Sequence, residues 1–173
     1  DSPMKNKRVI KNMKFTDFNL KAELNKAIEA AGFVEPSPVQ KDSIPIVLAG
    51  KDIVAQAQTG TGKTAAFGLP ILNMMKCDGS VELVVVVPTR ELAMQVSDEL
   101  FKFGKFLNVK TATVYGGTAY ARQIKHVESA SIIVATPGRF LDLLSKKQIN
   151  IDPRFVVLDE ADEMMDMGFL DDI

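Results

Sequence analysis

Short aliphatic runs, rich in β-branched residues, recur along the chain, and helical stretches lie between them. The runs are DIVAQA at 52–57, LVVVVP at 83–88, KTATVY at 110–115, SIIVA at 131–135 and RFVVLDE at 154–160. Continuously apolar runs of this kind are typical of strands that are buried on both faces of a parallel sheet. The sequence therefore predicts an α/β domain in which helices sandwich a parallel β-sheet.

The helices are expected between these runs. The spacing of apolar residues predicts them at 62–75, 90–106, 120–127 and 138–147. A further amphipathic helix is expected to run from Phe18 to Ala31 and to end at Gly32. In doubly wound sheets ligands bind at the carboxyl ends of the strands, so we expect functional residues at that edge.

Composition limits the class of protein. With 173 residues, 46% of them hydrophobic, the chain suits one globular domain, and its net charge of −1 excludes a bulk basic field. Its single cysteine, Cys77, cannot form an internal disulfide, so we expect a cytoplasmic protein. No apolar run approaches the roughly 20 residues of a membrane span, so no membrane partner is expected. Residues 1–14 are expected to be a basic tail without a role in the fold, its first residues an expression remnant.

A glycine-rich loop follows the first predicted strand. Residues 57–64 read AQTGTGKT and lead into a predicted helix. Gly60 and Gly62 let the backbone N–H groups turn inward, and the helix N-terminus adds positive charge, so the loop predicts a phosphate site. In this pattern Lys63 would reach the β- and γ-phosphates, and the Thr64 hydroxyl would hold Mg²⁺. Ala57 stands where the general phosphate-loop pattern has its first glycine. This difference narrows the class of phosphate-loop protein but leaves the phosphate-binding mechanism intact.

The last predicted strand ends in a cluster of acidic residues. Asp159, Glu160 and Asp162 follow the apolar run FVVL within four positions. Like charges this close repel unless a cation offsets them, and a nucleotide-bound Mg²⁺ would do so. Asp159 is expected to be the metal partner, and Glu160 to polarise the water that attacks the γ-phosphate. Asp162 is expected to hydrogen-bond a neighbouring loop.

These segments resemble one known family. DEAD at 159–162 and AQTGTGKT at 57–64, with GFVEPSPVQ at 32–40, PTRELA at 88–93, GG at 116–117 and TPGR at 136–139, are similar to the motifs of bacterial-type DEAD-box RNA helicases, in the same order. The resemblance implies a RecA-like P-loop NTPase domain over 15–173 that binds ATP, Mg²⁺ and RNA. It also implies catalytic roles for Lys63, Asp159 and Glu160, and metal binding by Thr64 and Asp159.

The resemblance assigns the nucleotide contacts. Gln40 would read adenine, since an amide can pair bidentately with N6 and N7 of that base. Ser37 would support the phosphate loop, and the ring of Phe15 would stack on the base, with a plain core contact as the alternative. The full set is Phe15, Ser37, Gln40, Gln58, Thr59, Gly60, Thr61, Gly62, Lys63 and Thr64.

The resemblance also assigns contacts to the RNA backbone. Thr136 is expected to cap the helix that begins at Pro137, which would make an anion site to which Arg139 adds charge. The full set is Pro88, Thr89, Arg90, Gly116, Gly117, Thr136, Pro137, Gly138 and Arg139. Such contacts read no base edges, so binding would be independent of sequence and sensitive to salt.

Three functions stay open. The first is the N-terminal domain of an RNA-dependent ATPase and helicase that needs a C-terminal RecA-like domain; the chain would end before the Ser-Ala-Thr motif and be nearly inactive alone. The second is an ATP-gated RNA clamp or remodelling platform without processive unwinding. The third is a P-loop ATPase that does not bind nucleic acid, which would leave PTRELA, GG and TPGR without a role.

Two weaker patterns are given structural interpretations. FKFGKF at 101–106 could be a stacking platform for single strands, but Leu92, Val96, Leu100 and Phe103 recur at helical spacing, which favours a core face. The single histidine, His126, has no ligand partners at metal-binding spacing, so no zinc site is expected.

Overall fold

The computed structural model describes residues 13–51 and 62–166, which divide into two compact units. The first unit comprises the residues up to Met75 together with Lys102–Leu107, and the second comprises Lys76–Phe101 and the residues from Asn108 onward. The predicted strand at 52–57, most of the phosphate loop and most of the N-terminal tail lie outside the described residues.

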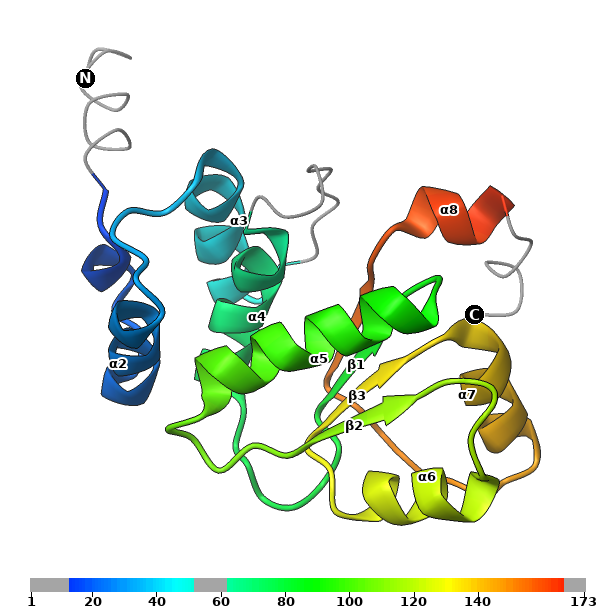
Figure 1. Cartoon of the computed structure of the whole chain (residues 1–173). Coiled ribbons are helices and arrows are strands. Elements are labelled where there is room, and N and C mark those ends of the chain that lie inside the picture. Colours follow the sequence, from blue (N-terminus) through cyan, green and yellow to red (C-terminus); the bar gives the residue numbers. More distant parts are fainter. Residues whose placement is uncertain (1–12, 52–61, 167–173) are drawn as a thin grey trace. The chain divides into compact units, whose positions relative to one another are not determined.

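The first unit is helical (Figure 1). The 3-10 helix η1 (Phe15–Phe18) precedes α2 (Ala22–Ala30), α3 (Pro38–Leu48) and α4 (Lys63–Met74), and α3 packs along α4. The side chains with no exposed surface here are Leu24, Ile44, Leu69 and Leu72. No helix in the described ranges is long and apolar enough to cross a bilayer.

The helix predicted from Phe18 to Ala31 is interrupted near its start. Phe18 closes η1, Asn19 adopts a left-handed backbone conformation with φ 56°, and α2 begins only at Ala22. Two hydrogen bonds close the first turn of η1: the N–H of Lys14 donates to Asp17 Oδ2 over 2.8 Å, and the N–H of Asp17 donates to Lys14 O over 3.0 Å. Leu20 is buried although it lies between the two helices, so its apolar character reports packing rather than helical periodicity.

Helix α3 was not predicted, although its start carries a readable signal. Ser37 is the N-cap, and its Oγ accepts from the N–H of Gln40 over 3.4 Å. Gln40 Oε1 accepts in return from the N–H of Ser37 over 2.9 Å. Pro38 occupies the first helical position, which suits its fixed φ angle. The sequence S-P-V-Q is therefore a reciprocal capping box.

The second unit is built on a four-stranded parallel sheet, as predicted. Its strands are β1 (Leu83–Val86), β2 (Thr111–Val114), β3 (Ile132–Ala135) and β4 (Phe155–Leu158), in the order β2-β3-β1-β4. The helices are α5 (Arg90–Gly104), α6 (Tyr120–Glu128), α7 (Pro137–Ser145) and α8 (Ala161–Asp166). Helix α5 belongs to this unit as far as Phe101.

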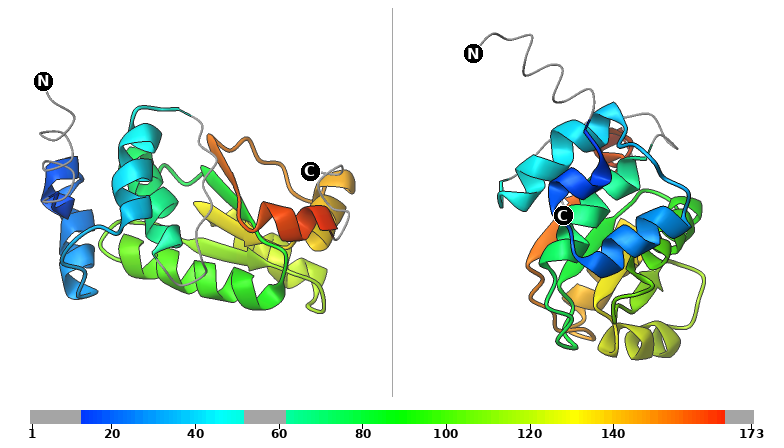
Figure 2. Two further views of the ribbon diagram at one scale, coloured as in Figure 1. Left: turned by 90° about the horizontal axis from the view of Figure 1, so that it is seen from above. Right: turned by 90° about the vertical axis from the view of Figure 1, so that its left-hand side faces the viewer.

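Helices cover both faces of this sheet (Figures 1 and 2). On one face, strand residues such as Val84, Val114 and Ile133 form a buried cluster with Val127 of α6 and Leu143 of α7. On the other face, the hydroxyls of Ser97 in α5 and Thr113 in β2 are hydrogen-bonded over 2.9 Å. Successive strand residues therefore point to opposite faces of the sheet, and helices cover both faces.

Strand β4 differs from the prediction that it is fully buried. It is the edge strand of the described sheet, and the exposed fractions of Val156 and Leu158 are 59% and 40%. Among the residues that the structure describes, no strand pairs with the outer edge of β4. Its apolar sequence therefore does not by itself give burial, because burial of a strand depends on what lies on each side of it.

Glu82, directly before β1, holds the turn that leads into the sheet. It is buried, its Oε1 accepts from the N–H of Lys76, and its Oε2 accepts from the N–H of Cys77, both over 2.8 Å. Arg154 Nη1 lies 3.5 Å from Oε1. The buried carboxylate therefore accepts from two successive backbone N–H groups and fixes the conformation of this turn.

We expect Glu82→Gln to lower the free energy of unfolding by about 1–3 kcal/mol, because an amide turns one of its two acceptor oxygens into a donor that faces a backbone N–H. Urea unfolding followed by circular dichroism measures the loss. Glu128→Gln makes the same chemical change at an exposed position of α6 and should be neutral. Equal effects of the two substitutions would contradict the role given to Glu82.

Gly62, the N-cap of α4, is held closely by α3. Its φ is +81°, and Gln40 Nε2 donates to its carbonyl oxygen over 3.0 Å. A Cβ built on Gly62 would lie 2.3 Å from Gln40 Nε2. Gly50 has a similar φ of +77°, but a Cβ there meets no atom within 4 Å. Of these two glycines, only Gly62 is therefore required both by its backbone conformation and by a close neighbour.

We expect Gly50→Ala to cost about 1 kcal/mol of unfolding free energy through left-handed strain alone. Gly62→Ala should cost about 3 kcal/mol, because it also displaces the buried amide of Gln40. Denaturant unfolding compares the two variants. In a double-mutant cycle, Gln40→Ala should relieve part of the cost of Gly62→Ala; strictly additive effects would show that the close contact is not the cause.

Candidate functional site

The parallel register brings four motif segments to one edge of the sheet. Val86 pairs with Ala135 and with Leu158, and Val114 pairs with Ala135, so the four strands end at the same level. The N–H of Val87 donates to Ala135 O, and that of Thr136 to Val114 O, both over 2.9 Å. The segments PTRE, GG, TPGR and DEAD follow directly, so the predicted convergence at the carboxyl edge is present in the second unit.

The segment PTRE begins α5. Thr89 Oγ1 accepts from the N–H of Leu92 over 3.2 Å, which is the geometry of an N-cap, and Pro88 is buried. Arg90 is exposed, and its guanidinium carbon lies 4.6 Å from the centroid of the Tyr115 ring. The ring of Tyr115 thus holds a cation at the sheet edge without neutralising its charge.

The two glycines lie in the loop between β2 and α6. Gly116 and Gly117 are exposed, Gly117 has a φ of +89°, and a Cβ on either would meet no atom within 4 Å. Thr118 Oγ1 donates to Tyr115 O over 3.1 Å across the pair. The outer side of the two glycines is therefore uncovered, while the hydrogen bond between Thr118 and Tyr115 holds the two ends of the loop together.

The segment TPGR begins α7. Thr136 is the N-cap residue as predicted, although its hydroxyl makes no capping hydrogen bond, and Pro137 is buried at the first helical position. Gly138 is exposed. Arg139 Nη1 donates to Thr118 O over 2.8 Å and to Gln123 Oε1 over 3.0 Å, and the guanidinium carbon lies 4.0 Å from the centroid of the Tyr120 ring. Arg139 thus connects α7 to the glycine loop.

A second polar cluster lies beside Arg139. The Tyr120 hydroxyl donates to the Asp142 carboxylate, and Lys146 Nζ lies 3.1 Å from Asp142 Oδ1. The hydrogen bond from Tyr120, and after it that from Lys146, lowers the pKa of Asp142 below its ordinary value. The hydrogen bond to Asp142 raises the pKa of Lys146. The hydrogen bonds of the Asp142 carboxylate thus go to Tyr120 and Lys146, whereas those of Arg139 go to Thr118 O and Gln123 Oε1.

The acidic segment follows β4. The exposed fraction of Asp159 is 7%, and its N–H donates to Val86 O over 2.9 Å, so it extends the pairing of β4 with β1 by one residue. Glu160 is half-buried and has a φ of +58°, which turns the chain into α8. Asp162 is exposed in the first turn of α8. A left-handed backbone at a residue other than glycine costs about 1–2 kcal/mol and is often found at functional sites.

The first unit carries the described nucleotide candidates. Lys63 and Thr64 form the first turn of α4, and Thr64 is buried. Ser37 and Gln40 cap α3, and Gln40 reaches Gly62. The helix N-terminus after a left-handed glycine fits a phosphate group, because its backbone N–H groups lack intrahelical partners. Four predicted contacts, Gln58, Thr59, Gly60 and Thr61, lie outside the described residues.

Phe15 lies in an aromatic cluster of the first unit. Its exposed fraction is 5%, and its ring makes edge contacts with Phe18 at 6.2 Å and Phe33 at 6.4 Å between centroids. Phe33 in turn lies 5.7 Å from Phe103, which is buried, so the core interpretation of FKFGKF holds for this residue. The other two aromatic residues of that segment, Phe101 and Phe106, are exposed. The described packing of Phe15 is the core contact left open as the alternative, and stacking on a base stays a prediction.

Sequence reasoning missed the side chains that hold the motif loops. Tyr115, Tyr120 and Gln123 lie outside the motifs and contact Arg90 or Arg139, and Asp142 in turn accepts from the Tyr120 hydroxyl. The only signal for Gln123 is a polar residue on the apolar face of a helix, four positions before the buried Val127. The contacts themselves could not be read from one strand or helix alone.

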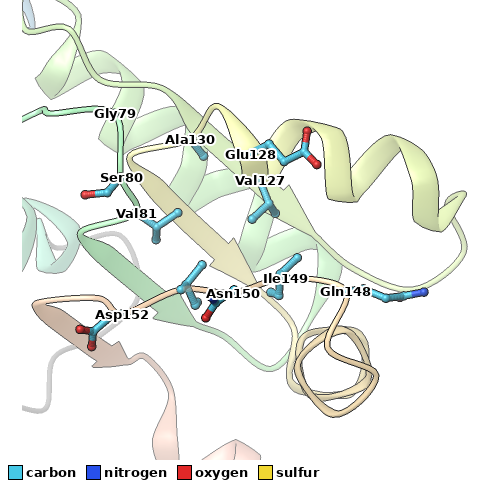
Figure 3. Close-up of a pocket in the computed structure, with 11 residues that line it drawn as sticks. Gly79, Ser80, Val81, Val127, Glu128, Ala130, Gln148, Ile149, Asn150 and Asp152 are labelled. Atoms are coloured by element: carbon cyan, nitrogen blue, oxygen red, sulfur yellow. The ribbon is translucent and has the colours of Figure 1, made fainter.

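A separate open pocket of about 560 Å³ lies at the opposite, amino edge of the sheet (Figure 3). Its lining comes from the residues before β1 and β3, the end of α6 and the segment before β4, including Val81, Ala130, Ile149, Glu128 and Asp152. None of the described motif residues lines it. The described motif edge is therefore not part of this pocket.

Comparison with known proteins gives relatives over most of the chain. A family model described as DEAD/DEAH box helicase matches residues 37–173. The chain is 53% identical over 161 residues to DEAD-box ATP-dependent RNA helicase RhpA of Helicobacter pylori, covering 92% of this chain and 33% of that protein. It is 48% identical over 162 residues to DEAD-box ATP-dependent RNA helicase CshA of Bacillus subtilis, with coverage of 92% and 33%. The chain thus spans about a third of the length of these relatives.

Solved structures share the fold. A DEAD box protein from Methanococcus jannaschii superposes with a TM-score of 0.88 at 41% identity, covering 92% of this chain and 45% of that one. A hypothetical ATP-dependent RNA helicase from Sulfolobus tokodaii gives 0.81 at 44% identity, covering 88% and 45%. These likenesses confirm the predicted RecA-like fold class. A family model that covers most of the sequence, with bacterial relatives that share about half of its residues, makes this chain a member of the DEAD/DEAH box helicase family.

Proposed function

We propose that the chain is the ATP- and RNA-binding N-terminal RecA-like domain of an ATP-dependent RNA helicase. The observation that carries this proposal is the alignment of four strand ends, which gathers PTRE, GG, TPGR and DEAD at one edge of the sheet. The names of the RhpA and CshA relatives support it. A P-loop ATPase that does not bind nucleic acid would have no use for two arginines and an open glycine pair at this edge.

The RNA contacts would go to the sugar-phosphate backbone. Arg90 and Arg139 supply cations there, Gly116 and Gly117 let a strand approach the protein backbone closely, and α7 presents its N-terminus beside them. In this proposal these groups contact phosphate and sugar and not the edges of bases. Binding would therefore be independent of sequence and would weaken with salt, although the chain has a net charge of −1.

The nucleotide would bind at the N-terminus of α4. Lys63 and Thr64 stand in its first turn, where Lys63 would neutralise phosphate charge and the Thr64 hydroxyl would offer an oxygen ligand. Gly62 leaves no room for a side chain between this turn and Gln40. Gln40 and Ser37 would hold the loop and select adenine. Gln58, Thr59, Gly60 and Thr61 would complete the phosphate site.

The acidic pair would perform the chemistry of hydrolysis. Asp159 offers hard carboxylate oxygens, the ligand type that Mg²⁺ prefers, and is nearly buried. When bound, Mg²⁺ supplies the positive charge that offsets both this carboxylate and the phosphates. Glu160 would accept a proton from the attacking water, and Asp162 would couple this segment to a neighbouring loop.

The activity would need a second RecA-like domain. The chain spans about a third of its curated relatives, and the family resemblance puts an arginine finger on that second domain. Alone, the chain should bind nucleotide weakly and hydrolyse almost none. Cytoplasmic location also stays a proposal, which rests on the single Cys77.

The test is steady-state ATP hydrolysis by the longest protein that the gene encodes, with and without single-stranded RNA. We expect RNA to stimulate hydrolysis at least about tenfold, which corresponds to about 1.4 kcal/mol of barrier. Glu160→Gln should reduce the stimulated rate about 100-fold or more, since general-base catalysis contributes about 10²–10⁴-fold. The 173-residue chain alone should stay near background.

A control measurement of RNA affinity separates an effect of the substitution on RNA binding from an effect on ATP hydrolysis. Glu160→Gln should leave RNA affinity in the presence of a non-hydrolysable ATP analogue unchanged, because the substitution removes a proton acceptor and not a phosphate contact. Stimulated hydrolysis without release of a short duplex would favour the RNA clamp. Hydrolysis that does not respond to RNA would contradict the proposed RNA-backbone site but would be consistent with the proposed phosphate site.

A further inference from the structure

We propose that Gln123, which belongs to none of the motifs, is a positioning residue for the RNA-backbone site. Its buried amide fixes the loop that carries Gly116 and Gly117, and it orients Arg139 on the same edge. This inference rests on the proposed function, because it concerns how that function's RNA contacts are held.

All the hydrogen-bonding groups of the Gln123 side chain are used inside the second unit. The residue lies in the first half of α6 with an exposed fraction of 3%. Its Nε2 donates to Tyr115 O over 2.8 Å and to Thr118 Oγ1, and its Oε1 accepts from Arg139 Nη1 over 3.0 Å. A primary amide has two donors and one carbonyl acceptor, so both N–H groups and the oxygen have partners here.

The two N–H groups of the Gln123 side chain hold both ends of the loop that carries Gly116 and Gly117. Tyr115 and Thr118 flank Gly116 and Gly117, and Gln123 binds to both flanking residues. On the outer side, a Cβ on either glycine would meet no atom within 4 Å. The loop conformation, including the φ of +89° at Gly117, therefore depends on contacts from its inner side, and Gln123 supplies two of them.

The acceptor of Gln123 fixes the direction of Arg139. Both Nη1 hydrogens of Arg139 are engaged, one by Thr118 O over 2.8 Å and one by Gln123 Oε1. The ring of Tyr120 supports the guanidinium face. Within residues 13–51 and 62–166, the Nε and Nη2 groups of Arg139 make no hydrogen bond. One edge of the guanidinium is thus anchored, and the other keeps its donors for a phosphate, which a guanidinium can bind with two parallel bonds.

No other side chain of similar size can replace this amide. Glutamate could accept from Arg139 but could not donate to Tyr115 O, and it would neutralise the cation that RNA needs. Leucine fills a similar volume but leaves Tyr115 O, Thr118 Oγ1 and Arg139 without this partner. The loop and the arginine would then lose their common support, while the sheet behind them keeps its own pairing.

The experiment measures the affinity of a fluorescein-labelled single-stranded oligouridylate, with a non-hydrolysable ATP analogue, at several salt concentrations. It uses the longest protein that the gene encodes. We expect Gln123→Leu to weaken binding about tenfold, the effect of losing one hydrogen bond to a charged group. We also expect the slope of log affinity against log salt to fall by about 0.7, the change for one lost phosphate contact on a single strand. Arg139→Ala should reduce the slope by the same amount.

The salt slope separates positioning from general destabilisation, because Gln123 is uncharged and cannot itself release a counterion. Ser131→Ala is the matched control: Ser131 is buried at the amino edge of β3, and its Oγ accepts from the N–H of Lys110 over 3.0 Å. It removes a buried hydrogen bond from the same unit and should leave both affinity and slope unchanged. The double variant Gln123→Leu/Arg139→Ala should bind like Arg139→Ala alone.

Gln123→Glu serves if the leucine variant does not fold, and it should reduce the slope in the same way because the new carboxylate neutralises Arg139. An unchanged slope in folded variants of Gln123, or additive effects with Arg139→Ala, would overturn the positioning role while the proposed function stands. Failure of the unsubstituted protein to bind the probe at any salt concentration would overturn the proposed function, and this inference with it.

Discussion

The in-register pairing of parallel strands is the constraint on which the rest of the second unit depends. Val86, Val114, Ala135 and Leu158 end their strands at one level, so four unrelated sequence segments emerge side by side. A slip of one residue in any strand would move its apolar side chains to the opposite face and its motif away from that level. The buried cluster formed by alternate strand residues opposes such slips, so the same packing that stabilises the sheet also positions the candidate site.

The candidate RNA edge holds its cations with aromatic rings rather than carboxylates. Arg90 lies over Tyr115 and Arg139 over Tyr120. A carboxylate partner would hold a guanidinium more strongly, but it would also cancel the charge that a phosphate needs. Asp142 lies close by, and Tyr120 and Lys146 engage it instead. A chain without bulk positive charge can in this way present local positive charge.

Patterns within one strand or one helix were sufficient to predict the sheet, the strand ends and the start of α7 at Thr136 and Pro137. Such patterns gave wrong or incomplete predictions where contacts with another part of the chain determine the local structure. The left-handed backbone of Asn19 separates η1 from α2, whereas the spacing of apolar residues predicts one continuous helix. Side chains of β4 are exposed because the burial of a strand depends on the elements beside it. The burial of Phe15 depends on Phe18 and Phe33, one of them far along the chain. Gln123 connects α6 to Tyr115 and to Arg139, and the spacing of residues within α6 does not predict those contacts.

The structural contacts of Gln40 leave part of its amide for the adenine-reading role proposed for it. Its Oε1 accepts from the N–H of Ser37 and its Nε2 donates to Gly62 O, so one lone pair and one hydrogen of the amide are used. Reading adenine takes one further acceptor and one further donor, which is the capacity that remains. The adenine-reading role therefore does not require the capping box or the link to Gly62 to break. It does require the remaining edge of the amide to be uncovered, since Gln40 has an exposed fraction of 2%. Selection of adenine and the conformation of the phosphate loop would then be linked through a single buried amide.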